Sequence, residues 1–242
     1  MKSGVKRMIE FNHVTKKYRS QAALNDFSLS LPAGKIIGLV GENGSGKSTA
    51  LKLISGIISP TKGSVTVDGE VATRRISSKV SYLSELDAYY TFYTVGETVS
   101  YYASLYSDFN QRKAEEILDY MKLDRRKKVK DLSKGNRGRL KIAVTLAREV
   151  PVILMDEPLS GLDPIVRDAI VKGLLSFIDF EKQTLIITTH EIKEIEPILD
   201  TVVLIKDGVL LKMEDVEELR MEQNVSIVEW MKQVYQDGGI DK

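Results

Sequence analysis

The sequence of 242 residues lacks cysteine altogether and contains only one tryptophan, six prolines and two histidines. Without cysteine the chain has no disulfides and no thiolate metal sites, which fits a reducing cytosol. No apolar run approaches the roughly 18 residues of a membrane span, and the basic start leads into no apolar stretch of signal-peptide length. We therefore expect a cytoplasmic chain that does not cross a membrane by itself.

An excess of charge of either sign is also missing. The chain has 35 lysine and arginine residues against 34 aspartate and glutamate residues, a formal net charge of +1. Proteins that bind nucleic acid through phosphate neutralisation usually carry a clear basic excess. We therefore do not expect nucleic acid as a partner.

Short apolar runs separated by helical patterns dominate the chain and predict a mostly parallel sheet covered by helices. The runs expected to be buried strands lie at 36–40, 80–83, 152–155, 185–188 and 202–205. The dipeptides Asp68-Gly69 and Asp207-Gly208 stand between further apolar runs and predict two hairpins. The expected fold class is therefore α/β, with antiparallel β pieces attached to the sheet.

The chain carries no internal repeat or low-complexity linker, so we expect one domain over residues 1–242. Strand signals disappear at about 94–148, where three helical stretches predict an inserted helical subdomain. Past Lys212 the sequence becomes acidic and helical over 214–222, and Trp230 lies in a last amphipathic segment. We expect this C-terminal extension, about 213–242, to pack on the surface.

Residues 41–48 match the P-loop pattern G-x-x-x-x-G-K-S/T and lie between a predicted strand and a predicted helix. Glycines allow backbone N–H groups to turn inward around phosphate, and the helix adds its positive N-terminal end. Lys47 is expected to reach the β- and γ-phosphates, Ser48 to bind Mg²⁺, and Thr49 to contact the α-phosphate side. The other expected nucleotide-binding residues of this segment are Gly41, Asn43, Gly44, Ser45 and Gly46.

Two acids, Asp156 and Glu157, directly follow the apolar run 152–155. Adjacent carboxylates are not tolerated inside a sheet without a charge partner, so we expect them at the strand's carboxyl end, beside the P-loop. Neighbouring residues of a strand point in opposite directions, which allows different roles. We assign the Mg²⁺ to Asp156 and the attacking water to Glu157; the alternative is that both acids cap the next loop.

His190 follows the buried run 185–188 and could contact the γ-phosphate from the end of its strand. A lone histidine is more often structural or solvent-facing, and His13 in the polar amino-terminal stretch keeps that interpretation.

A second glycine motif, Leu132-Ser133-Lys134-Gly135-Asn136, lies at the start of a predicted helix upstream of the two acids. With the P-loop it makes the chain resemble the ATP-binding cassette (ABC) family over about residues 8–212. The resemblance implies that Ser133 and Gly135 contact the γ-phosphate of an ATP held by a second subunit. Without the rest of the chain, Ser133 would be read as a simple helix cap.

Further matches occur in the family's order. Tyr18 is similar to the aromatic residue that stacks on adenine, although it could be plain surface. Residues 160–163 resemble the loop that crosses to the partner subunit, although Asp163 before Pro164 also suits a helix cap. His190 matches the family's switch histidine, which favours its functional interpretation.

Three positions depart from the family pattern. Glu85 stands where the family usually has a glutamine; it could bind Mg²⁺ but adds negative charge near the triphosphate. Lys134 replaces the first glycine of the usual Leu-Ser-Gly-Gly-Gln and either adds a cation near the phosphates or faces solvent. Asn136 is a shorter amide than the usual glutamine.

The resemblance implies an ATPase that uses ATP and Mg²⁺ to energise transport through a separate integral membrane permease. It implies a location at the inner face of the cell membrane and a second ATP-binding subunit, in a homodimer or a heterodimer. The aromatic stretch 89–93 lies where the family docks its membrane subunit, or it belongs to the subdomain core. Two alternatives are a soluble single-cassette ATPase for assembly or repair, and a regulatory module that holds ATP without useful turnover.

Overall fold

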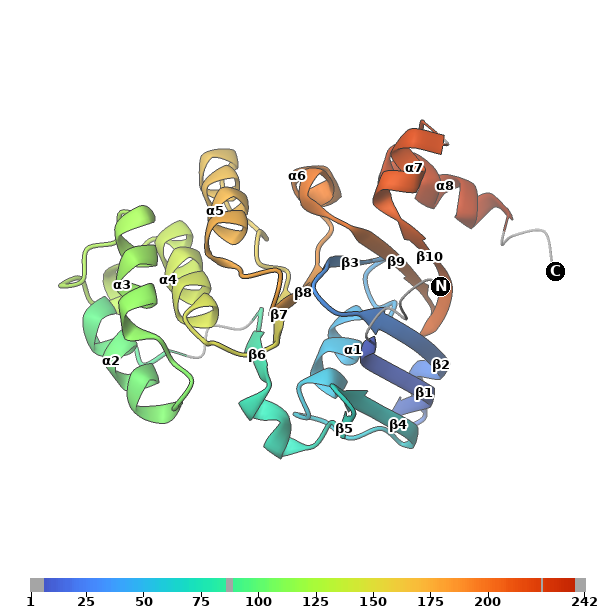
Figure 1. Ribbon diagram of the computed structural model, residues 1–242, viewed down its shortest axis with the longest axis horizontal. Helices are drawn as coiled ribbons and strands as arrows, with labels where there is room; N and C mark the ends of the chain where they lie inside the picture. Colours follow the sequence, from blue (N-terminus) through green and yellow to red (C-terminus); the bar gives the residue numbers. More distant parts are fainter. Residues whose placement is uncertain (1–6, 86–88, 223, 238–242) are drawn as a thin grey trace.

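The computed structural model describes residues 7–85, 89–222 and 224–237. Two β-sheets lie beside a group of helices (Figure 1). The strands are β1 (Arg7–Tyr18), β2 (Gln21–Pro32), β3 (Ile36–Val40), β4 (Lys62–Val67), β5 (Glu70–Val71), β6 (Val80–Leu83), β7 (Val152–Asp156), β8 (Thr184–Thr188), β9 (Thr201–Lys206) and β10 (Val209–Asp215). The helices are α1 (Lys47–Ile54), α2 (Val95–Leu105), α3 (Gln111–Tyr120), α4 (Lys134–Leu146), α5 (Pro164–Phe177), α6 (Ile192–Ile195), α7 (Val216–Glu222) and α8 (Ile227–Asp237), and short 3₁₀ turns lie at Arg74–Ser78, Val129–Asp131 and Glu196–Ile198.

The six-stranded sheet has the order β10-β9-β3-β8-β7-β6. Its pairs are parallel except for β10, which pairs antiparallel with β9. All five predicted strands are present in it, and β3, β7 and β8 are buried along their whole length. A strand buried on both faces has no polar side, which explains why these segments are continuous apolar runs rather than alternating ones.

The four-stranded sheet, with the order β2-β1-β4-β5, is antiparallel and includes two long strands that the sequence did not indicate. The register between β1 and β2 shifts four times, so the side-chain alternation loses its period of two. The polar amino-terminal stretch that contains His13 forms β1. Both predicted hairpins are present, with Asp68 and Asp207 in the left-handed region at φ 47° and 49°.

Each helix of the 95–146 region begins at a polar residue that caps it. The side chains of Thr94, Asn110 and Ser133 accept hydrogen bonds from backbone N–H groups in the first turns of α2, α3 and α4. The three helices lie together at one side of the six-stranded sheet, with α5 next to α4 (Figure 1). The second glycine motif, residues 132–136, lies in this group of helices at the start of α4.

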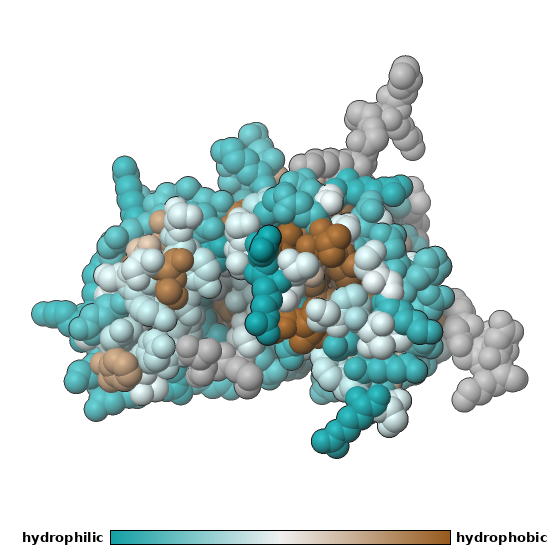
Figure 2. All heavy atoms as spheres, turned by 90° about the horizontal axis from the view of Figure 1, so that it is seen from below, coloured by the Kyte–Doolittle hydropathy of each residue, from teal (hydrophilic) through white to brown (hydrophobic). Residues whose placement is uncertain are grey.

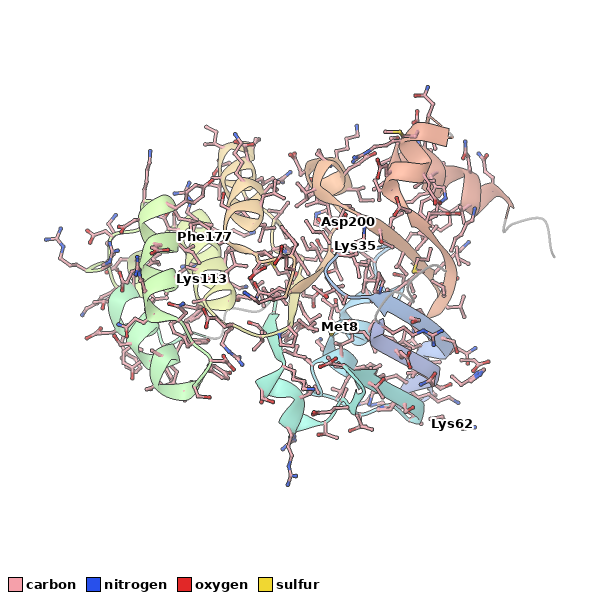
Figure 3. The ribbon with its side chains drawn as sticks, in the orientation of Figure 1. Met8, Lys35, Lys62, Lys113, Phe177 and Asp200 are labelled. Carbon is pink, nitrogen blue, oxygen red and sulfur yellow. The ribbon has the colours of Figure 1, made fainter. Side chains whose placement is uncertain are left out.

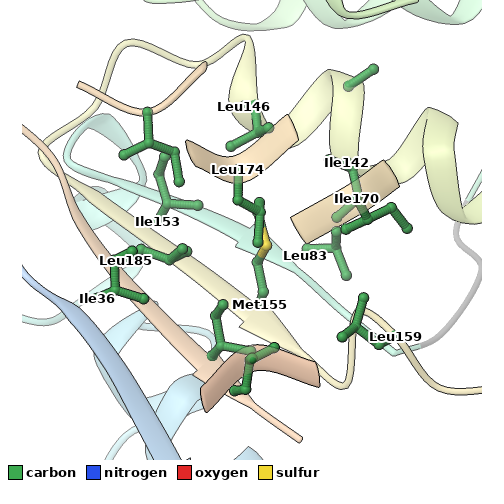
Figure 4. Close-up of a cluster of buried hydrophobic side chains, with 14 of the residues drawn as sticks. Ile36, Leu83, Ile142, Leu146, Ile153, Met155, Leu159, Ile170, Leu174 and Leu185 are labelled. Atoms are coloured by element: carbon green, nitrogen blue, oxygen red, sulfur yellow. The ribbon is translucent and has the colours of Figure 1, made fainter. Parts of the chain in front are cut away.

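The two faces of the six-stranded sheet belong to two separate hydrophobic clusters. Met155 of β7 lies in one cluster with side chains from α4 and α5, as Figure 4 shows. Leu154, its neighbour, lies in the other cluster with residues of the four-stranded sheet and of α1. Successive side chains of β7 point to opposite faces of the sheet, so this one strand contributes to both clusters and connects the helices to the four-stranded sheet.

Asp200 holds the start of β3 in place. Its carboxylate accepts a hydrogen bond from the backbone N–H of Ile36 at 2.7 Å and lies 3.5 Å from the Lys35 ammonium. Figure 3 shows Lys35 and Asp200 side by side. The contact fixes the entry to the strand that leads directly into the P-loop.

Hydrophilic residues cover most of the face seen from below, with the largest group of apolar residues to the right of its centre and smaller ones on the left (Figure 2). None of the described helices combines the length and the apolar character needed to span a bilayer.

The C-terminal region corrects one expectation. The predicted helix over 214–222 begins only at Val216, because β10 continues through Asp215 to complete its pairing with β9. In the amphipathic segment that follows, Trp230 faces inward: it is 1% exposed and belongs to the same cluster as Met155. Helices α7 and α8 lie beside β10 (Figure 1), and their buried residues extend the hydrophobic core.

Replacing Trp230 by alanine should lower the free energy of unfolding by about 3–5 kcal/mol, because the substitution leaves a large cavity in a packed cluster. Urea denaturation followed by circular dichroism measures this loss. Met221 of α7 is 77% exposed and supplies the control, since Met221→Ala should change the free energy by less than about 0.5 kcal/mol. Equal effects of the two substitutions would contradict the core assignment.

Candidate active site

A cavity of about 730 Å³ opens at the carboxyl end of β3, where the chain enters α1. Six residues of the predicted phosphate loop line it: Asn43, Gly44, Gly46, Lys47, Ser48 and Thr49. Across the cavity from this loop lie Tyr18, Glu85, Glu157 and His190. The structure thus brings together most of the predicted site residues from five separate segments of the chain. We call this space the P-loop cavity.

Two glycines give the P-loop its shape. Gly41 has φ 146° and a Cβ there would lie 2.1 Å from the carbonyl oxygen of Ile205. Gly46, with φ 110°, would place a Cβ 2.6 Å from the carbonyl oxygen of Ala23. Only glycine therefore fits at either position, and the backbone approaches its neighbours closely enough to form an anion-binding concavity.

Ser45 lies inside this loop and its Oγ is buried without a hydrogen-bond partner among the described residues. A buried hydroxyl without a partner costs free energy in a folded protein, so such groups mark places where a ligand or water is accepted. The loop thus offers an unmet hydrogen-bonding group together with a backbone cradle.

Lys47, the first residue of α1, is almost fully buried. Its ammonium donates to the carbonyl oxygens of Gly41 at 2.8 Å and Glu42 at 2.9 Å, which leaves one of its three protons for a further acceptor. Burial lowers the pKa of Lys47, and the nearby carboxylates of Glu157 and Asp156 oppose that shift. The Lys47 ammonium therefore favours a bound anion that would accept a hydrogen bond from its remaining proton.

Asp156, at the end of β7, collects three hydroxyl donors. The Ser48 Oγ donates at 2.9 Å, the Thr188 Oγ1 at 2.7 Å and the Tyr82 hydroxyl at 3.1 Å. Burial, and then the charge of Asp156, raise the pKa of Tyr82, so this hydroxyl stays a donor. The sequence indicated Ser48 and Asp156 but not Tyr82 or Thr188. The only signal for these two was a polar group near the end of an otherwise apolar strand.

Glu157 turns away from Asp156 because its backbone adopts a left-handed conformation, with φ 50°. Its N–H donates to the Thr188 carbonyl and hydroxyl oxygens, both at 3.1 Å, which holds this rare conformation. The Glu157 carboxylate accepts the backbone N–H of His190 at 3.2 Å and lies 2.8 Å from the His190 Nδ1. The two predicted acids therefore face different partners: Asp156 contacts the serine of the P-loop, and Glu157 contacts His190.

The described residues hold no group of three or more His, Cys, Asp or Glu side chains arranged to bind a metal ion by themselves. Glu85 lines the P-loop cavity, and its backbone carbonyl accepts a hydrogen bond from the Lys141 ammonium at 2.9 Å. Tyr18 closes β1 at the rim of the cavity, with the Lys16 ammonium 5.3 Å from the centre of its ring. Any metal here would need ligands from phosphate oxygens or water as well.

Ser133 and Gly135 are described by the structure and lie outside the lining of the P-loop cavity. Ser133 caps α4 by accepting a hydrogen bond from the Asn136 N–H at 3.3 Å. A Cβ on Gly135 would lie 3.4 Å from Val166, and one on Gly138 would lie 3.3 Å from Leu162. The first of these distances is an ordinary contact, and the second is slightly tight, so the glycine at 138 helps α4 to approach Leu162.

A glycine loop between a strand and a helix, with a strand-end acid bonded to the serine of that loop, defines a P-loop nucleoside triphosphatase. The family model described as "ABC transporter" matches residues 24–160, more than half of the sequence. The chain belongs to the ABC transporter family.

Two relatives illustrate the similarity. The bacitracin transport ATP-binding protein BcrA of Enterococcus faecalis is 34% identical over 218 residues, which cover 88% of this chain and 70% of that protein. The ABC transporter ATP-binding protein YtrB of Bacillus subtilis (strain 168) is 29% identical over 217 residues, covering 89% of this chain and 74% of that protein.

A solved structure extends the comparison to the fold. The dimeric post-hydrolysis state of the ATP-binding cassette MJ0796, bound to ADP and Pi, has a TM-score of 0.77 and 25% identity, covering 86% of this chain and 99% of that one. The fold class, the family and the ATPase class predicted from the sequence are thereby confirmed. The roles of single residues stay predictions.

Proposed function

We propose that this chain binds Mg-ATP in the P-loop cavity and hydrolyses it to drive transport through a separate membrane permease. The observation that carries the proposal is the contact of 2.9 Å between the Ser48 hydroxyl and Asp156. It joins the P-loop to the end of β7 in the arrangement that a nucleotide-bound Mg²⁺ requires.

The residues present fit the nucleotide and its metal. The Ser45 hydroxyl without a partner, the inward-turned glycine loop and the spare proton of Lys47 suit phosphate oxygens. Ser48, Asp156 and Glu85 offer the oxygen ligands that Mg²⁺ prefers. Mg²⁺ would neutralise charge on the phosphates. The other residues proposed to bind the nucleotide are Tyr18, Gly41, Asn43, Gly44, Gly46 and Thr49.

Glu157 is proposed to orient the attacking water and accept its proton. Its carboxylate lies at the wall of the P-loop cavity, so a water there would lie between Glu157 and the γ-phosphate. The contact of 2.8 Å with His190 Nδ1 fixes the carboxylate, and the other ring nitrogen, Nε2, which lies 3.6 Å from the Glu191 carboxylate, is proposed to contact the γ-phosphate. His190 would thus link the state of the phosphate to the position of the catalytic acid.

Hydrolysis is proposed to need a second ATP-binding subunit. Ser133 and Gly135 begin the 13-residue helix α4 outside the P-loop cavity of their own chain, so they are available to an ATP held elsewhere. One chain carries both halves of such a shared site, which supports a homodimer. The MJ0796 cassette is described as dimeric, in agreement with this arrangement.

An aromatic surface on the helical part is proposed to receive the permease. Tyr90 and Phe92 are 49% and 63% exposed, and Tyr90 also contacts the rings of Tyr93 and Tyr101. Tyr89 instead packs against the hydrophobic cluster, so the stretch 89–93 is part core and part surface. Exposed aromatic residues are favoured anchors at interfaces. Docking there would hold the chain at the inner face of the membrane.

Affinity purification of tagged Glu157→Gln chain from detergent-solubilised native cells with Mg-ATP tests this proposal. We expect one integral membrane protein to be recovered in fixed stoichiometry, because the variant is proposed to stay in its ATP-bound state. The double variant Tyr90→Ser/Phe92→Ser should lose that protein while still binding ATP. Recovery with soluble proteins alone would contradict the transport role and favour an ATPase for assembly or repair.

A further inference from the structure

A second, smaller cavity of about 170 Å³ adjoins the P-loop cavity. The two share Glu85, Glu157 and Ser160 in their walls, and we call the smaller one the side cavity. Its opposite wall is the face of α4 that carries Lys134 and, one and two turns later, Arg137 and Lys141. A cationic helix face is therefore directed at the acids that border the nucleotide site.

Lys134 reaches across this wall and does not extend away from the molecule. A Cβ on Gly161 would lie 2.0 Å from the Lys134 Nζ, so the ammonium covers the loop that follows Glu157. Gly161 has φ 64° and leaves the space that the lysine fills. Lys134 has no ion pair or side-chain hydrogen bond with another residue in the described part of the chain. Its charge is thus placed at the site without a direct contact to a described carboxylate.

Glu85 adds the opposite charge to the same place. It lines both cavities together with Glu157. A triphosphate bound next to Glu85, Asp156 and Glu157 would bring more negative charge together than Lys47 and Mg²⁺ neutralise. Glu85 and Lys134 are both exposed, so solvent screens their interaction with a bound triphosphate, and we expect each charge to change its binding constant by no more than roughly tenfold at low salt.

We propose that Lys134 offsets the negative charge of Glu85 at the nucleotide site, so that these two departures from the family pattern function as a pair. Lys134 is a positioning residue in this scheme: it stabilises the bound anion through its field and takes no part in proton transfer. The proposal rests on the proposed function, because it requires Mg-ATP in the P-loop cavity.

The test is a double-mutant cycle on the purified chain, with the KM for Mg-ATP and kcat as readouts. Lys134→Gln should raise the KM about tenfold at low salt, because an unneutralised Glu85 then repels the triphosphate. Adding Glu85→Gln should return the KM to within about threefold of the wild-type value. Lys134→Arg, which keeps the charge, should leave the KM unchanged, and the effect of Lys134→Gln should shrink at high salt.

The control Lys130→Gln removes an exposed cation from the 3₁₀ turn before α4 and should change neither constant. Thermal melting of each variant shows whether it is folded. An unchanged KM in Lys134→Gln, or a double variant as weak as Lys134→Gln alone, would overturn the pairing. If the wild-type chain does not hydrolyse ATP, or if hydrolysis survives Glu157→Gln, the proposed function itself is refuted. Failure of the pairing and failure of the proposed function therefore give different results.

Discussion

Glu157→Gln should lower kcat for ATP hydrolysis by a factor of about 10²–10⁴ while leaving the affinity for Mg-ATP nearly unchanged. The amide keeps the shape of the side chain and can still contact His190, but it cannot accept the proton of the attacking water. Phosphate release under saturating Mg-ATP measures the first effect, and equilibrium binding of a fluorescent ATP analogue measures the second. A variant that hydrolyses at the wild-type rate would show that this carboxylate is not the general base.

The same substitution should change the oligomeric state. If ATP joins two subunits and hydrolysis separates them, Glu157→Gln should sediment as a dimer with Mg-ATP and as a monomer without it. Adding Ser133→Arg should abolish the dimer and spare ATP binding, because Ser133 lies outside the P-loop cavity of its own chain. Ser107→Arg, at an exposed serine elsewhere on the helical part, is the control and should leave the dimer intact.

Lys47→Met should weaken Mg-ATP binding by roughly 10- to 100-fold. The variant removes a charged donor aimed at the phosphates, and a hydrogen bond to a charged group contributes about 1.5–3 kcal/mol. Isothermal titration with Mg-ATP measures the change, and hydrolysis should disappear with it. Methionine keeps the apolar stem, so the packing of the first turn of α1 is retained.

Lys52→Met is the matched control, because Lys52 lies on the same helix and is not part of the P-loop cavity wall. It removes the same charge from the chain and should leave the dissociation constant within about twofold of the wild-type value. Equal losses in both variants would indicate an effect of net charge on α1 and would contradict a specific phosphate contact at Lys47.

The buried strands and the helix starts could be predicted because their signals are local. Continuous apolar runs produced β3, β7 and β8, and the capping residues Thr94 and Ser133 marked two helices within one residue of where they begin. The P-loop and the acid pair were predictable for the same reason: each is a contiguous motif whose chemistry depends on residue type and spacing.

The parts that sequence reasoning missed depend on contacts between distant segments. β1 and β2 were not predicted because bulges interrupt the alternation of apolar and polar side chains along them. These bulges become visible only when the two strands are paired. Tyr82 and Thr188 became site residues only when the sheet placed them beside Asp156. The cluster that Trp230 joins could not be predicted, because the amphipathic pattern of α8 does not say what its apolar face packs against.

The glycine at the second turn of α4 has a mechanical consequence. Without a side chain at Gly138, α4 lies close to Leu162, where a Cβ would come within 3.3 Å. Leu162 is only five residues after Glu157, so we expect a displacement of the loop that follows this acid to be passed on to α4 by direct contact.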